Sequence, residues 1–329
     1  MHQAAWGARL PGVVNGDERE PPQPGRCVST PFANLEKPMS SSHPRPTTPT
    51  ITIVVPARNE ARNLELVLPT LPTVHEVIVV DGHSTDDTAA VVRRTLPSAR
   101  FIQQTRRGKG NALACGFEAA TGDIIVMFDA DGSADSTEIE AYVTSLTSGA
   151  DFAKGSRVLA AGGSEDITWL RDVGNRVLTG VTNVLFRTTY TDLCYGYNAF
   201  WRDILPVLSI PSSRGDQAAW GDGFEIETLI NCRVAAGGLQ IHEVPSIELE
   251  RIHGESNLNT FRDGARVLRT IFTERARRGT ARQTVPSADV ITAHTATAHT
   301  ATAHRATAHP APVQQALPAM MSIQQRESA

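Results

Sequence analysis

Short apolar runs alternate with amphipathic stretches through the middle of the chain. The apolar runs are residues 51–55, 77–80, 101–102 and 124–128. Their length and composition are those of buried strands. The stretches between them repeat apolar side chains every three to four residues, which is the period of one helical face. The pattern therefore predicts an α/β domain in which helices cover both faces of a mostly parallel sheet.

Three helices are expected between these strands. Their apolar faces are Leu64, Val67, Leu68 and Leu71 in the first, Ala89 and Val92 in the second, and Ala112, Leu113, Gly116, Phe117 and Ala120 in the third. Thr85 is the expected N-cap of the second helix, and Gly122 is the expected end of the third.

Both ends of the chain lack this periodicity. Residues 1–49 are rich in Pro, Ser, Arg and Gly, and the sequence from about Ser287 repeats Thr-Ala-His units before a Gln-rich end. Such compositions are typical of disordered segments. We therefore expect disorder at 1–49 and 283–329, around a catalytic domain at 50–260 and a basic helix at 261–282.

Composition and charge exclude several classes of protein. The chain has 329 residues, of which 40% are hydrophobic and 20% charged, so it can bury a sizeable core. Its net charge of −4 gives no basic field for nucleic acid, which we exclude as a partner. Its four cysteines lie far apart in sequence and fit free thiols in a reducing cytosol.

Two carboxylates, Asp129 and Asp131, directly follow the apolar run 124–128. Alternate side chains of an extended chain point the same way, so this pair can converge on one hard cation such as Mg²⁺ or Mn²⁺. These ions also bind phosphate oxygens, which predicts a substrate that carries phosphate. The structural alternative is that Asp129 caps the next helix and Asp131-Gly132 forms a turn.

Polar loops follow the other predicted strands as well. They are Pro56–Glu60, Asp81–Asp86 and Arg107–Asn111. Because the carboxyl ends of parallel strands meet at one edge of a sheet, these loops are expected to gather around Asp129 and Asp131.

In this order, the three loops and the Asp-x-Asp triplet resemble the nucleotide-sugar half of the inverting family 2 glycosyltransferases. The resemblance continues through Gly155–Arg157, Asp192–Tyr197, Gly223–Glu227 and Arg251–Leu258. This second set is most similar to the dolichyl- or polyprenyl-phosphate mannosyltransferase branch. The resemblance covers about residues 50–275 and implies a single catalytic domain of the Rossmann-like GT-A fold.

The resemblance also implies a donor site. Its expected residues are Pro56, Ala57, Arg58 and Glu60 around the base and ribose, Asp81 at the edge of the base, and Lys109, Asp129, Arg157 and Ser256 around the phosphates. A carboxylate can accept from ring N–H donors, as Asp81 would. The structural alternatives are a capped turn for Asp81 and a solvated basic loop around Lys109.

By the same resemblance, Asp129 and Asp131 hold Mg²⁺ or Mn²⁺ against the donor diphosphate. The ion would neutralise charge as the nucleoside diphosphate leaves. Ser133 is the candidate third ligand, at a position where members of the branch often carry Gln.

The residues expected to act in catalysis are Asp131, Glu227 and Arg251. Glu225 and Glu227 differ by about 200° on a helix, so only one of them faces the site, and the resemblance favours Glu227. Arg251 and Ser256 resemble the loop that closes over the donor phosphates. A solvent-facing helix residue and a surface loop are the respective alternatives.

The expected reaction is metal-dependent, inverting transfer of a hexose from a nucleotide sugar to a polyprenyl phosphate, preferably of mannose from GDP-mannose. Arg171, Arg176 and Arg202 are candidate contacts for the acceptor phosphate. The first alternative is transfer from UDP-glucose or GDP-mannose to a small hydroxyl acceptor, which needs a base such as Glu227. The second alternative is a non-catalytic nucleotide-sugar-binding protein.

A lipid acceptor requires contact with a bilayer. The predicted helix at 261–282 places Phe261, Ala265, Leu268 and Phe272 on one face and carries an excess of arginine, so we expect it at a membrane surface, with an ordinary surface helix as the alternative. A second stripe, Trp169, Val173, Val177, Val181 and Leu185, is expected to pack on the domain. We expect a cytoplasmic protein with peripheral contact at the inner face of the cell membrane.

Overall fold

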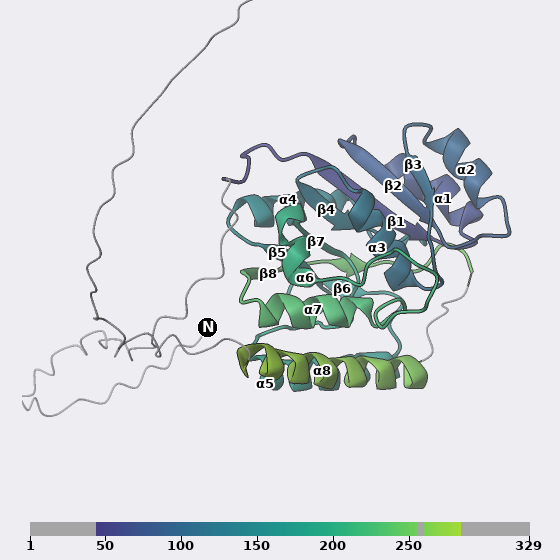
Figure 1. Ribbon diagram of the computed structural model, residues 1–329. Helices are drawn as coiled ribbons and strands as arrows, with labels where there is room; N and C mark the ends of the chain where they lie inside the picture. The colour runs from purple at the N-terminus through teal and green to yellow at the C-terminus, as the bar shows by residue number, and fades with distance from the viewer. Residues whose placement is uncertain (1–43, 255–259, 284–329) are drawn as a thin grey trace, which may run out of the picture. The chain divides into compact units, whose positions relative to one another are not determined.

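The computed structural model describes residues 44–254 and 260–283 (Figure 1). Within this part of the chain, seven strands form one sheet in the order β3-β2-β1-β4-β7-β5-β8. The strands are β1 (Ile51–Ala57), β2 (Glu76–Asp81), β3 (Arg100–Gln103), β4 (Ile124–Met127), β5 (Phe152–Ser156), β7 (Asn198–Trp201) and β8 (Ile241–Pro245). Two short strands, β6 (Gly163–Ser164) and β9 (Ile247–Glu248), pair separately.

All neighbours in the large sheet run parallel except at β7, which is antiparallel to both β4 and β5. Asn198 therefore lies beside Met127 at the carboxyl end of β4, and Trp201 lies beside Ile124 at its amino end. This confirms the predicted mostly parallel sheet. It also means that the segment before β7, and not the one after it, reaches the edge where the other strands end.

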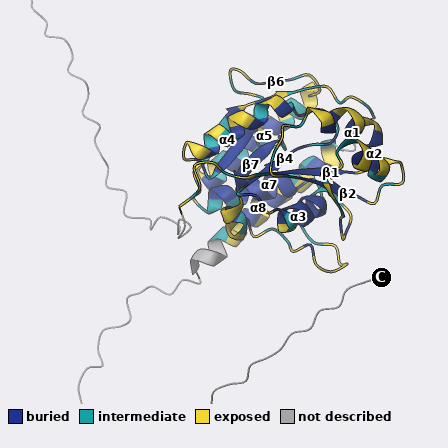
Figure 2. Cartoon of the chain, turned by 90° about the horizontal axis from the view of Figure 1, so that it is seen from above, coloured by how far each residue is buried: buried dark blue, intermediate teal, exposed yellow. Residues whose placement is uncertain are grey.

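Helices cover both faces of the sheet. They are α1 (Ala61–Val67), α2 (Thr88–Thr95), α3 (Lys109–Ala119), α4 (Ile139–Thr147), α5 (Trp169–Phe186), α6 (Leu205–Leu208), α7 (Ile226–Ala236) and α8 (Thr260–Gln283). Short 3₁₀ turns occur at Leu68–Thr70, Ser136–Glu138 and Arg202–Ile204. Figure 2 shows α3 on the opposite side of β1 and β2 from α1 and α2. The predicted N-cap Thr85 is wrong, because α2 begins after Asp87.

The strand residues are buried on both faces, as their continuous apolar runs predict. Ile53, Val54 and Val55 have no exposed surface. A second cluster joins α5, α7 and α8 through Phe186, Cys232 and Ile271. Because Ile271 is fully buried there, α8 packs as part of the domain, and the expected boundary at residue 260 does not separate it.

The described chain begins with a contact that the boundary at residue 49 did not anticipate. Arg45 pairs with Asp151 at 2.7 Å and Asp203 at 2.9 Å, and its guanidinium lies over the ring of Trp201. Most of the two expected disordered segments lies outside the described residues. None of the described helices is long and apolar enough to cross a lipid bilayer.

The packing of α3 against the sheet depends on Gly116. A Cβ atom at this position would collide with a methyl group of Val54, which lies in the interior of β1. We expect Gly116→Ala to lower the free energy of unfolding by about 1–3 kcal/mol, as overpacked cores do. Urea titration measures this change.

Gly174→Ala in α5 is the matched control, since a Cβ atom added at this position would have no other atom within 4 Å. Helix propensity alone should stabilise this variant by up to about 1 kcal/mol. Equal effects of the two substitutions would contradict the proposed packing of α3.

Candidate active site

The loops after β1 and β2 are tied together at the carboxyl edge of the sheet. Ala57 and Asp81 are register partners, and the amide of Gly82 donates to the carbonyl of Ala57 at 2.7 Å. The side-chain oxygen of Asn59 accepts from the amide of Thr85 at 2.8 Å. These bonds hold Pro56–Glu60 and Asp81 side by side, as the sequence predicts.

Asp81 is 5% exposed at the end of β2. Its carboxylate accepts from the amide of Ser84 at 3.2 Å, while Gln103 lies at the limit of hydrogen bonding, at 3.5 Å. The turn-capping contact is therefore present, and a role in binding a base stays a prediction.

Lys109 is the centre of an ionic cluster, the lysine cluster, with Asp129 and Glu227. Its Nζ atom lies 2.8 Å from Oδ1 of Asp129 and 2.8 Å from Oε1 of Glu227. Burial would lower the pKa of Lys109, but the two carboxylates outweigh burial and hold this pKa well above its ordinary value. The ammonium group is thus charged at any pH near neutrality, and it joins the start of α3 to the segment after β4 and to the first turn of α7.

The position of Lys109 at the start of α3 is set by a buried ion pair. Arg106 contacts both carboxylate oxygens of Asp222 at 2.8 Å. The carbonyl of Asp222 in turn accepts from the amide of Gly110 at 2.8 Å. A Cβ atom at Gly108 or Gly110 would collide with this loop backbone, so the glycines around Lys109 are needed for close approach.

Gly196 closes the other side of the lysine cluster. A Cβ atom there would lie 3.1 Å from Oε1 of Glu227 and 3.3 Å from Nζ of Lys109. Gly196 stands between the buried Tyr195 and Tyr197 just before β7. The segment before the antiparallel strand therefore places the backbone of Gly196 against the ion pairs, where there is little room for a side chain.

Arg251 makes a second set of ion pairs beside the first. Its Nη2 atom lies 2.6 Å from Oδ2 of Asp131, and its Nη1 atom lies 3.2 Å from Oε1 of Glu60. The amide of Ile252 donates to the carbonyl of Asp131 at 3.1 Å, which anchors the loop of Arg251 on the Asp-x-Asp segment. The structure thus brings the predicted residues Glu60, Asp131 and Arg251 into direct contact.

Burial raises the pKa of Glu60, although hydrogen bonding from Asn63 and the charge of Arg251 partly offset the effect. A hollow of about 430 Å³ opens beside this pair. It is lined by Arg58, Asn59, Glu60, Arg62, Asn63, Asp86, Arg251, His253 and Gly254. Its three arginines outnumber its two carboxylates, Glu60 and Asp86, and this favours an anionic ligand.

Asp129 and Asp131 offer hard oxygen ligands, and each already faces a cation. Among the described residues, no group of three or more His, Cys, Asp or Glu side chains converges as a complete metal site. Two carboxylates completed by substrate phosphates are the usual arrangement for Mg²⁺. Ser133 donates its hydroxyl to Oδ1 of Asp131 at 2.7 Å, so it lies beside the carboxylates, and its role as a ligand stays a prediction. The residues present fit a divalent cation that binds together with a diphosphate.

Comparison with known proteins identifies the family. A family model described as Glycosyl transferase family 2 matches residues 52–208. An uncharacterized glycosyltransferase of Mycobacterium tuberculosis is 32% identical over 209 residues, which cover 64% of this chain and 89% of the relative. The chain is a family 2 glycosyltransferase. It is therefore an enzyme that uses a nucleotide sugar.

Other relatives of this glycosyltransferase differ in what they act on. The polyprenol monophosphomannose synthase of Mycolicibacterium smegmatis is 27% identical over 65% of this chain and 83% of its own. A crystal structure of glucosyl-3-phosphoglycerate synthase from M. tuberculosis with Mn²⁺, UDP and glucosyl-3-phosphoglycerate has a TM-score of 0.54 and 23% identity, covering 69% of this chain and 80% of that one. The second likeness confirms the expected fold class.

Of the two glutamates at the start of α7, Glu227 belongs to the lysine cluster. Glu225 instead accepts from the amides of Gly221 and Gly223, at 3.0 and 3.3 Å, and stabilises the loop before the helix. This agrees with the expectation that only one of them faces the site. Ser256, the last predicted donor contact, lies outside the described residues.

Three predicted phosphate contacts of the glycosyltransferase are engaged elsewhere. Arg157 binds both oxygens of the buried Asp192, at 2.7 and 3.0 Å, and Glu248 at 2.9 Å. Arg202 is wrong as an acceptor contact, because it follows the antiparallel β7 and donates to the carbonyl of Gly122 at the amino end of β4. Arg176 pairs with Asp172 on the outer surface of α5.

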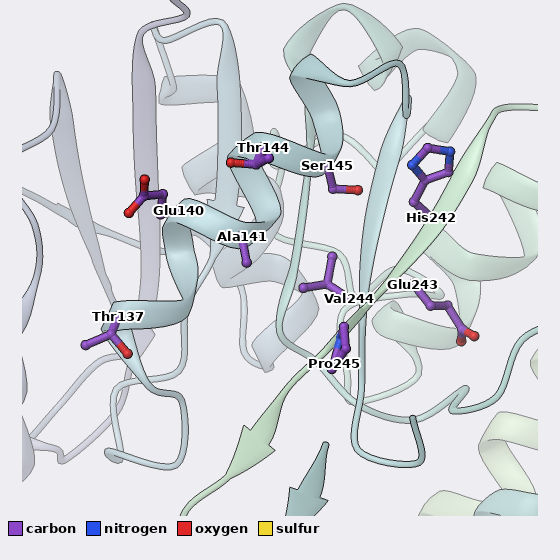
Figure 3. Close-up of a pocket in the computed structure, with 9 residues that line it drawn as sticks. All are labelled: Thr137, Glu140, Ala141, Thr144, Ser145, His242, Glu243, Val244 and Pro245. Atoms are coloured by element: carbon purple, nitrogen blue, oxygen red, sulfur yellow. The ribbon is translucent and has the colours of Figure 1, made fainter. Parts of the chain in front are cut away.

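A larger hollow lies away from these ion pairs, between α4 and β8 (Figure 3). Its volume is about 860 Å³, and none of the predicted site residues lines it. Glu140 and Glu243 supply the charge of its lining, which disfavours phosphate. Of the two hollows, the one beside Arg251 is therefore better suited to a ligand that carries phosphate.

Sequence reasoning missed Gly196 and the Arg106–Asp222 pair. A glycine between two aromatic residues, Tyr195 and Tyr197, was a usable sign of close backbone approach. The ion pair left no such sign, because its partners are 116 residues apart and neither occupies a recognisable motif.

The ionised carboxylate of Asp192, paired with Arg157, makes the free energy of unfolding depend on pH. Burial raises the pKa of Asp192, but the hydrogen bonds of Arg157 and the charges of Lys154 and Arg157 outweigh it and lower this pKa to about 2. With an unfolded pKa of about 3.9, the pair contributes roughly 2–3 kcal/mol at neutral pH. This stability is fully present above the unfolded pKa and is lost as pH falls toward the folded pKa.

We expect Asp192→Asn to be less stable than the wild type at pH 6, with a deficit that shrinks as the pH approaches 3. Urea titration at several pH values measures this change. Asp172→Asn, which breaks an exposed ion pair on α5, is the control and should give a small deficit at every pH. A constant deficit for Asp192→Asn would rule out the assigned titration.

Proposed function

We propose that this enzyme transfers a hexose from a nucleotide sugar to a phosphate monoester, with GDP-mannose and a polyprenyl phosphate as the preferred pair. The observation that carries the proposal is the engagement of Glu227 by Lys109 at 2.8 Å. The carboxylate of Glu227 already has a cationic partner, so an acceptor that needs no base suits the site better than one that must lose a proton.

The acceptor classes place different demands on this carboxylate. A hydroxyl group needs a base to take its proton as it attacks. A phosphate monoester is already largely dianionic near neutral pH, with a second pKa of about 6. Its oxygen attacks the anomeric carbon directly, and the bond to the donor phosphate breaks with inversion. Cations such as Arg251 then stabilise the departing diphosphate.

A divalent cation completes the proposed site. Asp129 and Asp131 would hold Mg²⁺ or Mn²⁺, which supplies positive charge to the leaving diphosphate. Lys109 and Arg251 already hold these two carboxylates in place. The support for mannose and for a polyprenyl phosphate is the likeness to polyprenol monophosphomannose synthase.

A second candidate is transfer from UDP-glucose to a small hydroxyl acceptor. It is favoured by the fold likeness to glucosyl-3-phosphoglycerate synthase, which has been crystallised with Mn²⁺, UDP-glucose and phosphoglyceric acid. In that reaction Glu227 would act as the base. Membership of an enzyme family argues against a protein that only binds nucleotide sugars.

The deciding experiment offers radiolabelled GDP-mannose or UDP-glucose, with Mg²⁺ or Mn²⁺, to polyprenyl phosphate and to phosphorylated and unphosphorylated small alcohols. We expect label from GDP-mannose in the lipid phase. Label only in the small alcohols would establish the second candidate instead. Binding of donor without transfer to any acceptor would overturn both.

Asp131→Asn should lower the rate of transfer by about 10²–10³-fold, because a ligand and counter-charge for the leaving diphosphate is lost. Rates at saturating donor and circular dichroism measure activity and fold. Asp135→Asn, four residues along, is the control, since its side chain caps Ser136–Glu138 and Asn caps equally well. Retained activity in Asp131→Asn would remove this residue from the site.

Glu227→Gln should separate the two acceptor classes. With a phosphate acceptor we expect a loss below about 10-fold and a rate that still rises with the second ionisation of the acceptor near pH 6. With a hydroxyl acceptor the loss should reach about 10²–10⁴-fold. The exposed Glu140→Gln on α4 is the matched control. A large loss with polyprenyl phosphate would contradict direct attack by the phosphate.

A further inference from the structure

Helix α5 is inverted in its distribution of polar and apolar residues. Trp169 and Val177, two residues of the stripe expected to pack on the domain, are 77% and 61% exposed, and the nearby Val184 is 80% exposed. Val181 and Leu185 of the same stripe do pack on the domain. The buried face also carries Asn175 and Thr179. These polar groups are needed inside, because Asn175 donates to Asp192 at 2.9 Å and Thr179 accepts from an amide.

Helix α8 has the same inverted distribution. Phe261, Leu268 and Phe272 are 79%, 38% and 53% exposed, and at 100° per residue they lie within about 40° of one another. Asp263 and Glu274 are buried on the other side of the helix. Glu274 is held there by Arg233 at 2.9 Å.

The two helices lie next to each other. Leu178, Val181 and Leu185 of α5 and Val267 of α8 pack against the same cluster, which includes the buried Ile271. At the ends of the helices, Arg278 reaches the carbonyl of Phe186 at 3.5 Å. Figure 1 shows both helices at the bottom of the domain, with α5 largely behind α8. We call the exposed apolar residues of the two helices, Trp169, Val177, Val184, Phe261, Leu268 and Phe272, the apolar face.

Arginines flank this apolar face. Arg269 and Arg275 of α8 are exposed and, at 100° per residue, lie about 80° and 40° from Phe261 on the two sides of the stripe, whereas the acidic residues of the helix, Asp263 and Glu274, are buried. A second copy of the chain, packed by a twofold axis, would bring these like charges together. An anionic lipid surface accepts both the apolar stripe and the arginine rim.

We propose that α5 and α8 together form a docking surface for an anionic membrane. The surface is connected to the site, since α8 begins six residues after Gly254 in the loop that carries Arg251. A docked enzyme would receive the phosphate of a polyprenyl acceptor while its lipid chain stays in the bilayer. This last point rests on the proposed function, whereas the docking itself does not.

The test is sedimentation of the full chain with vesicles of phosphatidylcholine alone or mixed with phosphatidylglycerol, without donor or acceptor. We expect binding to the anionic vesicles that weakens with salt. The pairs Phe261→Glu/Phe272→Glu and Val177→Glu/Val184→Glu should each lower partitioning by at least about 10-fold. Leu66→Glu, a 50% exposed apolar position on α1, is the matched control and should bind like the wild type.

Several outcomes would overturn the proposal. They are wild-type chain that stays with the supernatant, variants that sediment as well as the wild type, and a wild-type dimer that the pairs of substitutions convert to monomer in light scattering. Thermal unfolding and transfer to a short-chain, water-soluble polyprenyl phosphate show whether the variants fold. Because vesicle binding is measured without substrates, failure of docking and failure of the proposed reaction are separate results.

Discussion

The ammonium group of Lys109 is the interaction on which the site depends. It joins Asp129, which follows β4, to Glu227, which lies in the first turn of α7, at 2.8 Å each. Removing one partner of a buried ion pair usually costs more than the pair contributes, because the remaining charge is left without compensation. Two carboxylates therefore remain close together only while this lysine stays between them.

The arrangement around Lys109 is repeated at Arg251, which faces Asp131 and Glu60. Each carboxylate of the Asp-x-Asp segment thus has a cationic partner before any substrate arrives, and each of the two cations is shared with a second carboxylate. A cation that binds with a diphosphate changes this balance of charge only slightly, since it brings its own anionic ligand. Such a site is suited to the donor and the ion together more than to either alone.

Much of the fold and the Asp-x-Asp segment was accessible from the sequence. Val and Ile at 51–55 and 77–80 can be buried on both faces only in a covered, parallel sheet, and carboxylates after such a strand must lie at its edge. Strand β7 was not predicted, and its direction was not accessible, because a short segment such as Asn198–Trp201 reads the same in either direction. Arg202 was misplaced for this reason.

The sequence also did not show which side chains pair with one another in the fold. Arg157 fits a phosphate in composition, but in the fold Asp192 and Glu248 occupy its guanidinium. The exposed residues of the α5 stripe were misassigned for a similar reason. Asn175 is buried because it donates to Asp192, which lies in a loop after the helix, and the helix sequence alone does not show this contact. Hydrophobic periodicity describes one helix or strand at a time, and it does not show which side chain elsewhere in the chain a residue will pair with.

Because β7 runs antiparallel to β4, the segments before and after it lie at opposite edges of the sheet. The stretch before the strand contributes Gly196 to the lysine cluster, while Arg202–Leu208 after it turns at the opposite edge of the sheet. Changes at exposed positions of that turn, Pro206 and Val207, can accumulate without touching the reacting groups, whereas Ile204 and Leu208 are buried in the core. The turn after β7 is thus a natural place to attach a label or a tether that reports on the enzyme while it works.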